Sequence, residues 1–218
     1  MRYIIMCGGR VAEWETPRQL LEIGGEAIVA RTIRLLREAG VDDIAISSHD
    51  PSFLDFGVPV LIHENNYYSR RYNDYDGHWY ECFYPTKEPV CYIFGDVVFS
   101  PAAIRTIVGS ETDDIELFGS MPPFAPEYPK RWIEPFALKV TDTDHLKAAI
   151  ARADELDAQG AFWRQPIMWE LWTVIRGHPL QTKADEYVYD YTAINDYTCD
   201  VDHPCDVAVM ERLVNEKA

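Results

Sequence analysis

The sequence predicts an α/β fold of three layers, with helices on both faces of a mainly parallel, mixed central sheet. Short apolar runs without polar alternation recur in the first half of the chain, as in strands that are buried on both faces. Segments with the spacing of amphipathic helices lie between these runs, and strands that alternate with helices usually form a parallel sheet. We expect a single domain over residues 1–218, because no repeat or linker divides the chain.

The first half of the chain is expected to alternate between strands and helices. Four buried strands are predicted, at residues 2–7, 41–50, 58–64 and 89–100. After the first strand, Val29, Ile33 and Leu36 follow the i, i+4, i+7 spacing of a helix that ends at Gly40. A second helix begins at Pro101, because proline is favoured in the first turn of a helix.

The second half departs from this alternation. Two further strands are predicted at residues 114–120 and 131–140, and helices are predicted at 142–158 and 162–177. The last helix begins near Pro204 and places Val209, Met210, Leu213 and Val214 on one face.

Composition limits the partners that the protein can have. A formal net charge of -16 repels polyanions, so nucleic acid and anionic membranes are not expected as partners. No apolar run reaches the roughly 20 residues of a membrane span, and the N-terminus lacks the features of a signal peptide, so we expect a cytoplasmic protein. The five cysteines include no Cys-x-x-Cys pair, and we expect reduced thiols. A small phosphorylated ligand remains compatible with this charge.

Chemistry-bearing residues follow two of the predicted strands. Ligands of open α/β sheets bind beyond the carboxyl ends of the strands, where Gly8 and Gly9 follow the first strand and Gly95 and Asp96 are expected at the tip of the fourth. Glycines at such an edge let backbone N–H groups approach a phosphate closely. A tight turn would also explain the two glycines at the first strand.

Four segments together resemble one family. "MCGGR", "PRQLLEIGGEAIVARTIRLLREAGVDDIAI", "YIFGDVVFS" and "CDVDHPCDVAVMERL" resemble the nucleotidyltransferases with a glycosyltransferase A-like fold, which include sugar-1-phosphate and phosphocholine nucleotidyltransferases. The family frame is matched at Gly8, Gly9, Pro17, Leu20, Gly24, Gly25 and Gly40. The sequence departs from the family loop at Val11, where the third glycine is expected, at Glu13, where an arginine is expected, and at Arg18, which replaces the signature lysine.

The resemblance implies a magnesium-dependent nucleotide site. Asp96 corresponds to the aspartate that holds Mg²⁺ under the nucleotide phosphates, and Asp202 is the expected second ligand, with Asp200 as its rival. Arg18, assisted by Arg10, is expected to be catalytic. The expected nucleotide-binding residues are Cys7, Gly8, Gly9, Arg10, Arg18, Asn66 and Gly95. Asp206, in the first turn of the last helix, is expected to be structural.

The acceptor side of the site is expected to involve an aromatic-rich segment. Arg70 and Arg71 are adjacent cations in an acidic chain, and Trp79 is one of several rings that could stack on a base or surround a cationic acceptor. A surface salt bridge would also explain the arginines, and core packing the ring. The segment around Glu134 resembles the family strand whose glutamate contacts acceptor hydroxyl groups, and a solvent-facing position on a strand would also explain this residue.

The implied reaction is transfer of a nucleoside monophosphate from a nucleoside triphosphate to a small phosphorylated acceptor, with release of pyrophosphate. The partners are then the triphosphate and the acceptor, and a homodimer is possible. Two alternatives stay open: a glycosyltransferase of the same fold, and a nucleotide-binding homologue with impaired catalysis. A dinucleotide oxidoreductase ranks last, because the first loop lacks the Gly-x-Gly-x-x-Gly motif.

Overall fold

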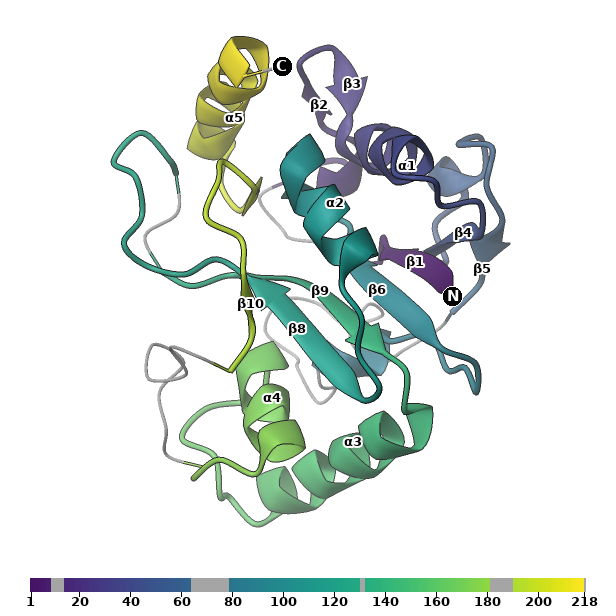
Figure 1. Cartoon of the computed structure of the whole chain (residues 1–218), viewed down its shortest axis with the longest axis vertical. Coiled ribbons are helices and arrows are strands. Elements are labelled where there is room, and N and C mark those ends of the chain that lie inside the picture. Colours follow the sequence, from purple (N-terminus) through teal and green to yellow (C-terminus); the bar gives the residue numbers. More distant parts are fainter. Residues whose placement is uncertain (9–13, 64–78, 130–131, 181–189, 218) are drawn as a thin grey trace.

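A seven-stranded sheet forms the centre of the protein. The computed structural model describes residues 1–8, 14–63, 79–129, 132–180 and 190–217 (Figure 1). The strand order is β10-β8-β9-β6-β1-β4-β5. The strands are β1 (Arg2–Met6), β4 (Ile44–Ser47), β5 (Val60–Leu61), β6 (Val90–Phe94), β8 (Ile115–Gly119), β9 (Pro135–Val140) and β10 (Thr192–Ala193).

The sheet is mainly parallel. Strand β1 pairs in parallel with both β4 and β6, and β10 pairs in parallel with β8. Strand β9 lies between β6 and β8 and runs antiparallel to both. The expectation of a mainly parallel, mixed sheet is therefore confirmed.

Helices cover both faces of the sheet. Figure 1 shows α1 (Ile28–Glu38) and α2 (Pro101–Gly109) on one side and α3 (Thr143–Ala158) and α4 (Met168–Arg176) on the other. The apolar side chains of β1 and β6 are buried between these two layers. Both strands end at the same edge of the sheet because they run in parallel, so residues that follow them are neighbours.

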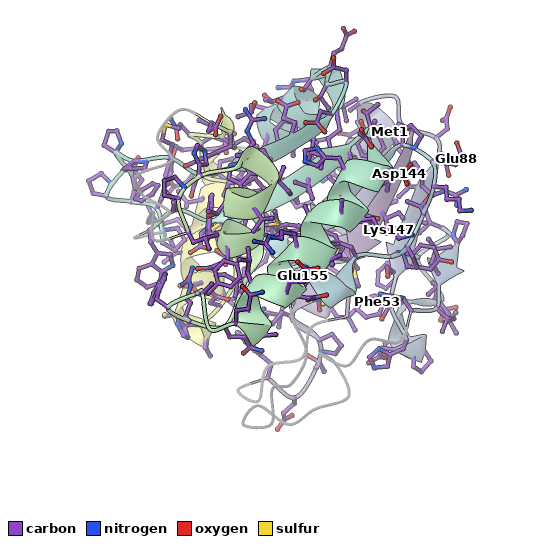
Figure 2. All side chains as sticks on the ribbon, turned by 90° about the horizontal axis from the view of Figure 1, so that it is seen from below. Met1, Phe53, Glu88, Asp144, Lys147 and Glu155 are labelled. Carbon is purple, nitrogen blue, oxygen red and sulfur yellow. The ribbon has the colours of Figure 1, made fainter. Side chains whose placement is uncertain are left out.

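Helix α3 shows the pattern that makes it a surface helix. Its N-cap is Asp142, whose side chain accepts a hydrogen bond from the backbone N–H of His145 at 2.9 Å. Asp144, Lys147 and Glu155 lie on the exposed side of the helix, as seen from below in Figure 2. Leu146, Ala149, Ala153 and Leu156 are buried. This spacing explains why the sequence predicted the helix correctly.

Helix α4 is shorter than the sequence predicted. The apolar pattern begins at residue 162, but the helix begins at Met168. Pro166 lies in between, and a proline disfavours helical conformation in the residue before it. The Glu170 carboxylate accepts hydrogen bonds from the backbone N–H of Ile167 at 3.0 Å and from Arg164 Nε at 2.6 Å, which fixes the start of the helix.

The predicted strand at residues 89–100 is divided into two. Strand β6 ends at Phe94, and the chain turns at Gly95 and Asp96 into β7 (Val97–Val98). Strand β7 leaves the main sheet and pairs antiparallel with β11 (Cys199–Asp200). The turn thus brings the C-terminal part of the chain to the carboxyl end of β6.

A hairpin near the N-terminus was not predicted. Strands β2 (Glu22–Ile23) and β3 (Glu26–Ala27) are joined by Gly24 and Gly25, whose φ angles of 66° and 75° lie in the left-handed region that favours glycine. A Cβ atom on Gly24 would lie 2.8 Å from a methyl carbon of Val214 in α5 (Pro204–Lys217). Gly24 and Gly25 therefore form the turn of a hairpin that packs against α5.

A second, smaller apolar core joins distant segments. It contains Ile23, Ile28, Val98, Tyr197, Cys199, Val201, Met210, Leu213 and Val214. Figure 1 shows α5 at the same end of the molecule as the β2–β3 hairpin. This core packs residues 197–217, here called the C-terminal arm, against the start of α1 and against β7. It thereby sets the position of the residues between β11 and α5.

Short 3-10 turns also occur in the described ranges. They are η1 (Arg18–Leu20), η2 (Pro51–Phe53) and η3 (Trp79–Cys82). Within the described ranges, no helix has both the length and the apolar character that crossing a membrane requires.

Candidate active site

The site begins at the turn after β6. The Gly95 N–H donates to the carbonyl oxygen of Met6 in β1 at 3.1 Å, and a Cβ atom at residue 95 would lie 2.3 Å from that same oxygen. Only glycine allows this close approach of two strand ends. The next residue, Asp96, accepts a hydrogen bond from the backbone N–H of Val201 at 3.1 Å through its own carbonyl oxygen. The turn therefore links two ends of the parallel sheet to the C-terminal arm.

Arg18 connects two of the predicted metal ligands. It begins the η1 turn, and its side chain is only 12% exposed. Its Nη2 atom donates to Asp96 Oδ2 at 2.6 Å, and its Nη1 atom donates to Asp202 Oδ1 and to the carbonyl oxygen of Val201, the latter at 3.1 Å. Burial opposes the charge on Arg18, but the carboxylates of Asp96 and Asp202 raise its pKa overall. The guanidinium group is therefore a fixed positive charge between two carboxylates.

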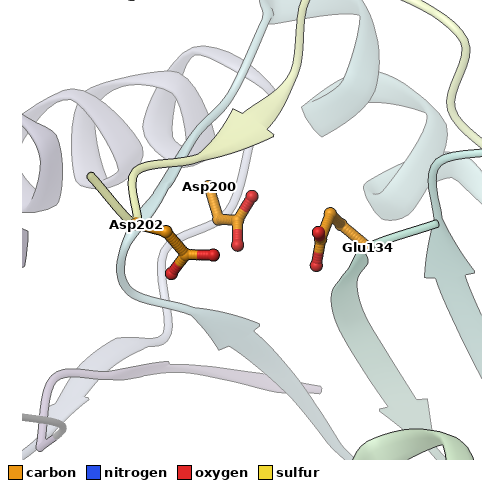
Figure 3. A group of neighbouring side chains, drawn as sticks. All are labelled: Glu134, Asp200 and Asp202. Atoms are coloured by element: carbon orange, nitrogen blue, oxygen red, sulfur yellow. The ribbon is translucent and has the colours of Figure 1, made fainter. Parts of the chain in front are cut away.

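Three carboxylates form a cluster beside this arginine. Oxygen atoms of Glu134, Asp200 and Asp202 all lie within 4.8 Å of one another. Figure 3 shows that their carboxylate groups converge, with Asp200 and Asp202 coming from the C-terminal arm and Glu134 from the residue before β9. Asp202 belongs to both arrangements, because it pairs with Arg18 and also contributes to the cluster.

Backbone contacts fix Glu134 in the cluster. Its N–H donates to Ser120 Oγ at 2.8 Å, and its carbonyl oxygen accepts from the Ser120 N–H at 2.9 Å. A Cβ atom on Gly119 would lie 2.6 Å from the same carbonyl oxygen. The β8–β9 pairing is irregular between Phe118 and Gly119, so the glycine lets the two strands close around the base of Glu134.

The loop that carries Asp202 is held by two residues. The Asp206 carboxylate accepts hydrogen bonds from the backbone N–H groups of Asp202 and His203 at 3.2 and 2.8 Å. Trp14 donates from its indole Nε1 to the Asp202 carbonyl oxygen at 3.3 Å. Asp206 was expected to be structural, and these contacts agree with that interpretation. Trp14 was not singled out from the sequence, and no motif there indicates its role.

A small cavity opens at the carboxylate cluster. It has a volume of about 160 Å³, and its lining includes Trp132 together with Glu134, Asp200 and Asp202. Trp132 is 63% exposed, which is unusual for so large an apolar side chain. Trp132 was not singled out from the sequence, where its one signal is its position two residues before Glu134. The cavity therefore combines an apolar ring with a negatively charged wall.

The surroundings of Asp200 in the cluster oppose ionisation of its carboxyl group. Burial, followed by the charges of Glu134, Asp202 and Asp96, raises the pKa of the Asp200 carboxyl group well above its ordinary range. Several carboxylates therefore share this site with a single guanidinium group among the described residues. An added cation would relieve the repulsion.

Asp200→Asn is expected to stabilise the protein in the absence of divalent cations. The folded protein holds the Asp200 proton more tightly than the unfolded chain does, so wild-type stability falls as pH rises through the raised pKa. The amide cannot ionise, and its melting temperature at pH 8 should exceed the wild-type value by roughly 2–4 °C, or about 1 kcal/mol.

Differential scanning calorimetry in EDTA at pH 8 and pH 5 checks this. The difference in melting temperature between variant and wild type should shrink at the lower pH, because the raised pKa leaves more of the wild-type Asp200 protonated there than at pH 8. Asp113→Asn, at an exposed position before β8, is the control and should change little at either pH. A rise in melting temperature for Asp200→Asn that is equal at both pH values would contradict the electrostatic explanation.

Cys7 and Gly8, which follow β1, are buried next to this site. Cys7 is buried at the end of β1, where its N–H donates to the Ser47 carbonyl oxygen at 2.9 Å. Burial, and then the charge of Asp96, raises the pKa of its thiol well above the ordinary value, so it is a neutral packing group. Gly8 is also buried. The other expected binding groups lie outside the described part of the structure: Gly9, Arg10, Asn66, Arg70, Arg71 and the Trp79 side chain.

The donor set of the cluster fits a hard divalent cation. All three side chains offer carboxylate oxygens, which are the ligands that Mg²⁺ and Mn²⁺ prefer. Asp96 lies across Arg18 from Asp202 and is not a member of the three-residue cluster. The structure thus brings Asp96, Asp202, Asp200 and Glu134 to one site, in which Asp96 and Asp202 pair with the Arg18 guanidinium group and Asp202 also belongs to the three-carboxylate cluster.

Similar folds occur in several solved structures. A candidate glucose-1-phosphate thymidylyltransferase from Bacillus anthracis superposes with a TM-score of 0.62 at 17% identity, over 100% of this chain and 96% of that one. The 2-C-methyl-D-erythritol 4-phosphate cytidylyltransferase from Thermus thermophilus gives 0.58 at 14% identity, over 98% of each chain. The CTP:phosphocholine cytidylyltransferase from Streptococcus pneumoniae gives 0.53 at 15% identity, also over 98% of each chain. The chain therefore has the glycosyltransferase A-like fold of nucleotidyltransferases.

The family of the chain follows from its sequence. The family model described as the MobA-like NTP transferase domain matches residues 3–165, and this protein belongs to that family. No curated protein sequence matches it significantly. The family suspected from the sequence motifs is thereby confirmed. The matched range includes Arg18, Asp96 and Glu134, whereas Asp200 and Asp202 lie beyond it.

Proposed function

We propose that this protein transfers a nucleoside monophosphate from a nucleoside triphosphate to a small phosphorylated acceptor and releases pyrophosphate. The observation that carries the proposal is Arg18 held between Asp96 and Asp202 at the carboxyl end of β6, next to Glu134 and Asp200. Phosphoryl chemistry needs positive charge near the phosphates and carboxylates that hold a cation. This edge of the sheet has groups of both kinds.

The names of the three solved relatives support the acceptor class. Each name pairs a nucleotide transfer with a phosphorylated small molecule: glucose-1-phosphate, methylerythritol 4-phosphate or phosphocholine. In such a reaction an acceptor phosphate oxygen forms a bond to the α-phosphorus of the triphosphate. The bond between the α-phosphorus and the oxygen that bridges it to the β-phosphorus breaks, and pyrophosphate leaves with that oxygen. A phosphate monoester with a second pKa of about 6 is largely ionised near pH 7, so no side chain needs to act as a general base.

The residues of this chain then act through position and charge. Arg18 would neutralise charge on the phosphates as pyrophosphate leaves, and its planar group can hold two phosphate oxygens at once. Asp96 and Asp202, with Asp200 and Glu134 beside them, would hold Mg²⁺. When bound, this ion neutralises phosphate charge and keeps the triphosphate in line for attack. The hydrogen bonds of Asp206 and Trp14 to the Asp202 backbone would keep this loop in place as the ligands bind.

The cavity next to Trp132 is the proposed site of the acceptor's non-phosphate part. Trp132→Ala removes the exposed ring from the cavity wall and leaves the carboxylates unchanged. We expect the KM for the acceptor to rise about tenfold, equivalent to a contact of about 1.4 kcal/mol, with little change in kcat. Steady-state kinetics over a range of acceptor concentrations measures both. Trp163→Ala, at another exposed tryptophan outside the lining of this cavity, is the control.

The first test of the proposed function is ligand binding followed by turnover. Thermal melting with each of CTP, UTP, GTP, ATP and dTTP, with and without Mg²⁺, should reveal the donor, because a hundredfold excess over Kd stabilises a protein by about 2.7 kcal/mol. Pyrophosphate release is then measured with a panel of phosphorylated alcohols and sugars. Sugar transfer from a nucleotide sugar without pyrophosphate would favour a glycosyltransferase, and binding without any turnover would favour a non-catalytic homologue.

A further inference from the structure

Arg18 occupies a place that a cation would compete for. Its two terminal nitrogens are bound to Asp96 and Asp202, which offer carboxylate oxygens of the kind that hold a divalent cation, and Asp202 is also a member of the three-carboxylate cluster. The single positive charge of the guanidinium group therefore already offsets part of the negative charge of both carboxylates. A divalent ion that bound both of them would have to take over that role from Arg18.

The arginine is incompletely satisfied in this position. Its Nε atom is buried and has no hydrogen-bond partner among the residues that the structure describes. Its bonds run from Nη1 and Nη2, to two carboxylates and one carbonyl oxygen. Leaving a buried donor unpaired costs about 1–3 kcal/mol, so a permanent structural ion pair would be expected to satisfy it. The arrangement is instead consistent with a side chain that has a second, more complete set of partners.

The charge distribution supplies the driving force. Four carboxylates, from Asp96, Glu134, Asp200 and Asp202, surround the site, and Arg18 pairs with only two of them. Asp202 is shared between the arginine and the three-carboxylate cluster. A divalent ion attracted by Glu134 and Asp200 would therefore draw Asp202 away from Arg18, and this exchange leaves the guanidinium group in need of an anion.

We propose that Arg18 is an internal counter-ion that a divalent cation displaces from Asp96 and Asp202, which releases the guanidinium group to bind the nucleotide phosphates. This inference rests on the proposed function and adds an order to it: cation and nucleotide binding are coupled through one side chain. The cation takes Asp96 and Asp202 from Arg18, and the nucleotide phosphates take Arg18 from these two carboxylates. Each ligand therefore frees the groups that the other binds, so each strengthens the binding of the other. Without nucleotide, the ion pairs of Arg18 with Asp96 and Asp202 compete with the cation and weaken its binding.

The coupling predicts a gain of function in an arginine variant. Arg18→Gln removes the competing charge, so Mn²⁺ should bind about tenfold more tightly than to wild type in the absence of nucleotide, within the usual range of coupling between two sites. Arg18→Lys keeps the charge but not the two-nitrogen fork that bridges Asp96 and Asp202, so its Mn²⁺ affinity should lie between those of wild type and Arg18→Gln. The measurement is free Mn²⁺ by electron paramagnetic resonance during titration of the purified chain.

A matched control separates this effect from a general change in charge. Arg34→Gln removes the same single charge, but from an exposed side chain that pairs with Glu26 and Glu38. Mn²⁺ affinity in this variant should match wild type. An Arg18→Gln affinity that is equal to or weaker than that of Arg34→Gln overturns the proposal, as does undetectable binding in both.

A second measurement uses the unmodified protein, in case the glutamine variant folds poorly. Nitrogen-15 NMR of the arginine side chains follows the Arg18 Nε–H group, assigned by its absence in Arg18→Lys. Hydrogen exchange at this group should accelerate on addition of Mg²⁺, because the bridge to Asp96 and Asp202 opens. Unchanged exchange at saturating Mg²⁺ overturns the proposal. Both readouts are independent of turnover, so a failure of pyrophosphate release would count against the proposed function alone.

Discussion

Asp96→Asn is expected to lower the rate of pyrophosphate release by about 100- to 1000-fold, which corresponds to roughly 3–4 kcal/mol of lost transition-state stabilisation. The amide has nearly the same size as the carboxylate but no charge. It can neither hold a cation under the phosphates nor compensate Arg18 at the 2.6 Å contact. The effect should appear mainly in kcat, because the lost interaction strengthens as charge develops during transfer.

Single-turnover and steady-state assays with the donor found by thermal melting measure this effect. The folded state should survive, because the backbone contacts at residue 96 are unchanged and the asparagine oxygen can still accept a hydrogen bond from Arg18. Asp113→Asn removes an exposed carboxylate away from the site and should keep wild-type activity. Wild-type rates in Asp96→Asn would remove this residue from the catalytic machinery.

Gly95→Ala is expected to be the most destabilising single substitution at the site. The added Cβ atom would lie 2.3 Å from the Met6 carbonyl oxygen and 3.0 Å from the Cys7 sulfur. Neither β1 nor β6 can move away without breaking the central pair of the sheet, so the clash involves backbone and not a flexible side chain. We expect a loss of about 3 kcal/mol, or a fall of roughly 6–12 °C in melting temperature.

The control is another glycine without such a neighbour. Gly109 ends α2, and a Cβ atom there would meet no atom within 4 Å. Gly109→Ala should therefore be neutral or slightly stabilising, because alanine loses less conformational entropy on folding. Thermal and urea unfolding of both variants test the comparison. Equal stabilities for the two alanine variants would show that the strand ends can separate at low cost.

Much of the fold could be predicted because its signals are local. The apolar runs at β1 and β6 reflect strands that are buried on both faces, and the spacing in α1 and α3 reflects helices with one buried side. Two of the differences between prediction and structure also have local causes. Pro166 delays α4, and Gly95 turns the fourth predicted strand out of the sheet.

The antiparallel strand and the small sheet were less predictable. Strand β9 has the same apolar character as its parallel neighbours, so composition does not reveal its direction. Strands β7 and β11 have two residues each, and nearly half of the chain lies between the paired residues 97 and 200. Pairing at such separation depends on the closure of a long loop and on packing, which a short pattern does not encode.

By itself, the sequence determined the fold class, the family resemblance and the identity of the acidic residues near the end of β6 and before α5. The tertiary structure alone decided that Arg18 lies between Asp96 and Asp202, 78 and 184 residues away along the chain, and that Glu134 and Trp132 face the same acidic cavity. The physical reason is that apolar periodicity specifies which face of an element is buried. The meeting of charged side chains depends on how the second core docks the C-terminal arm against β7 and α1.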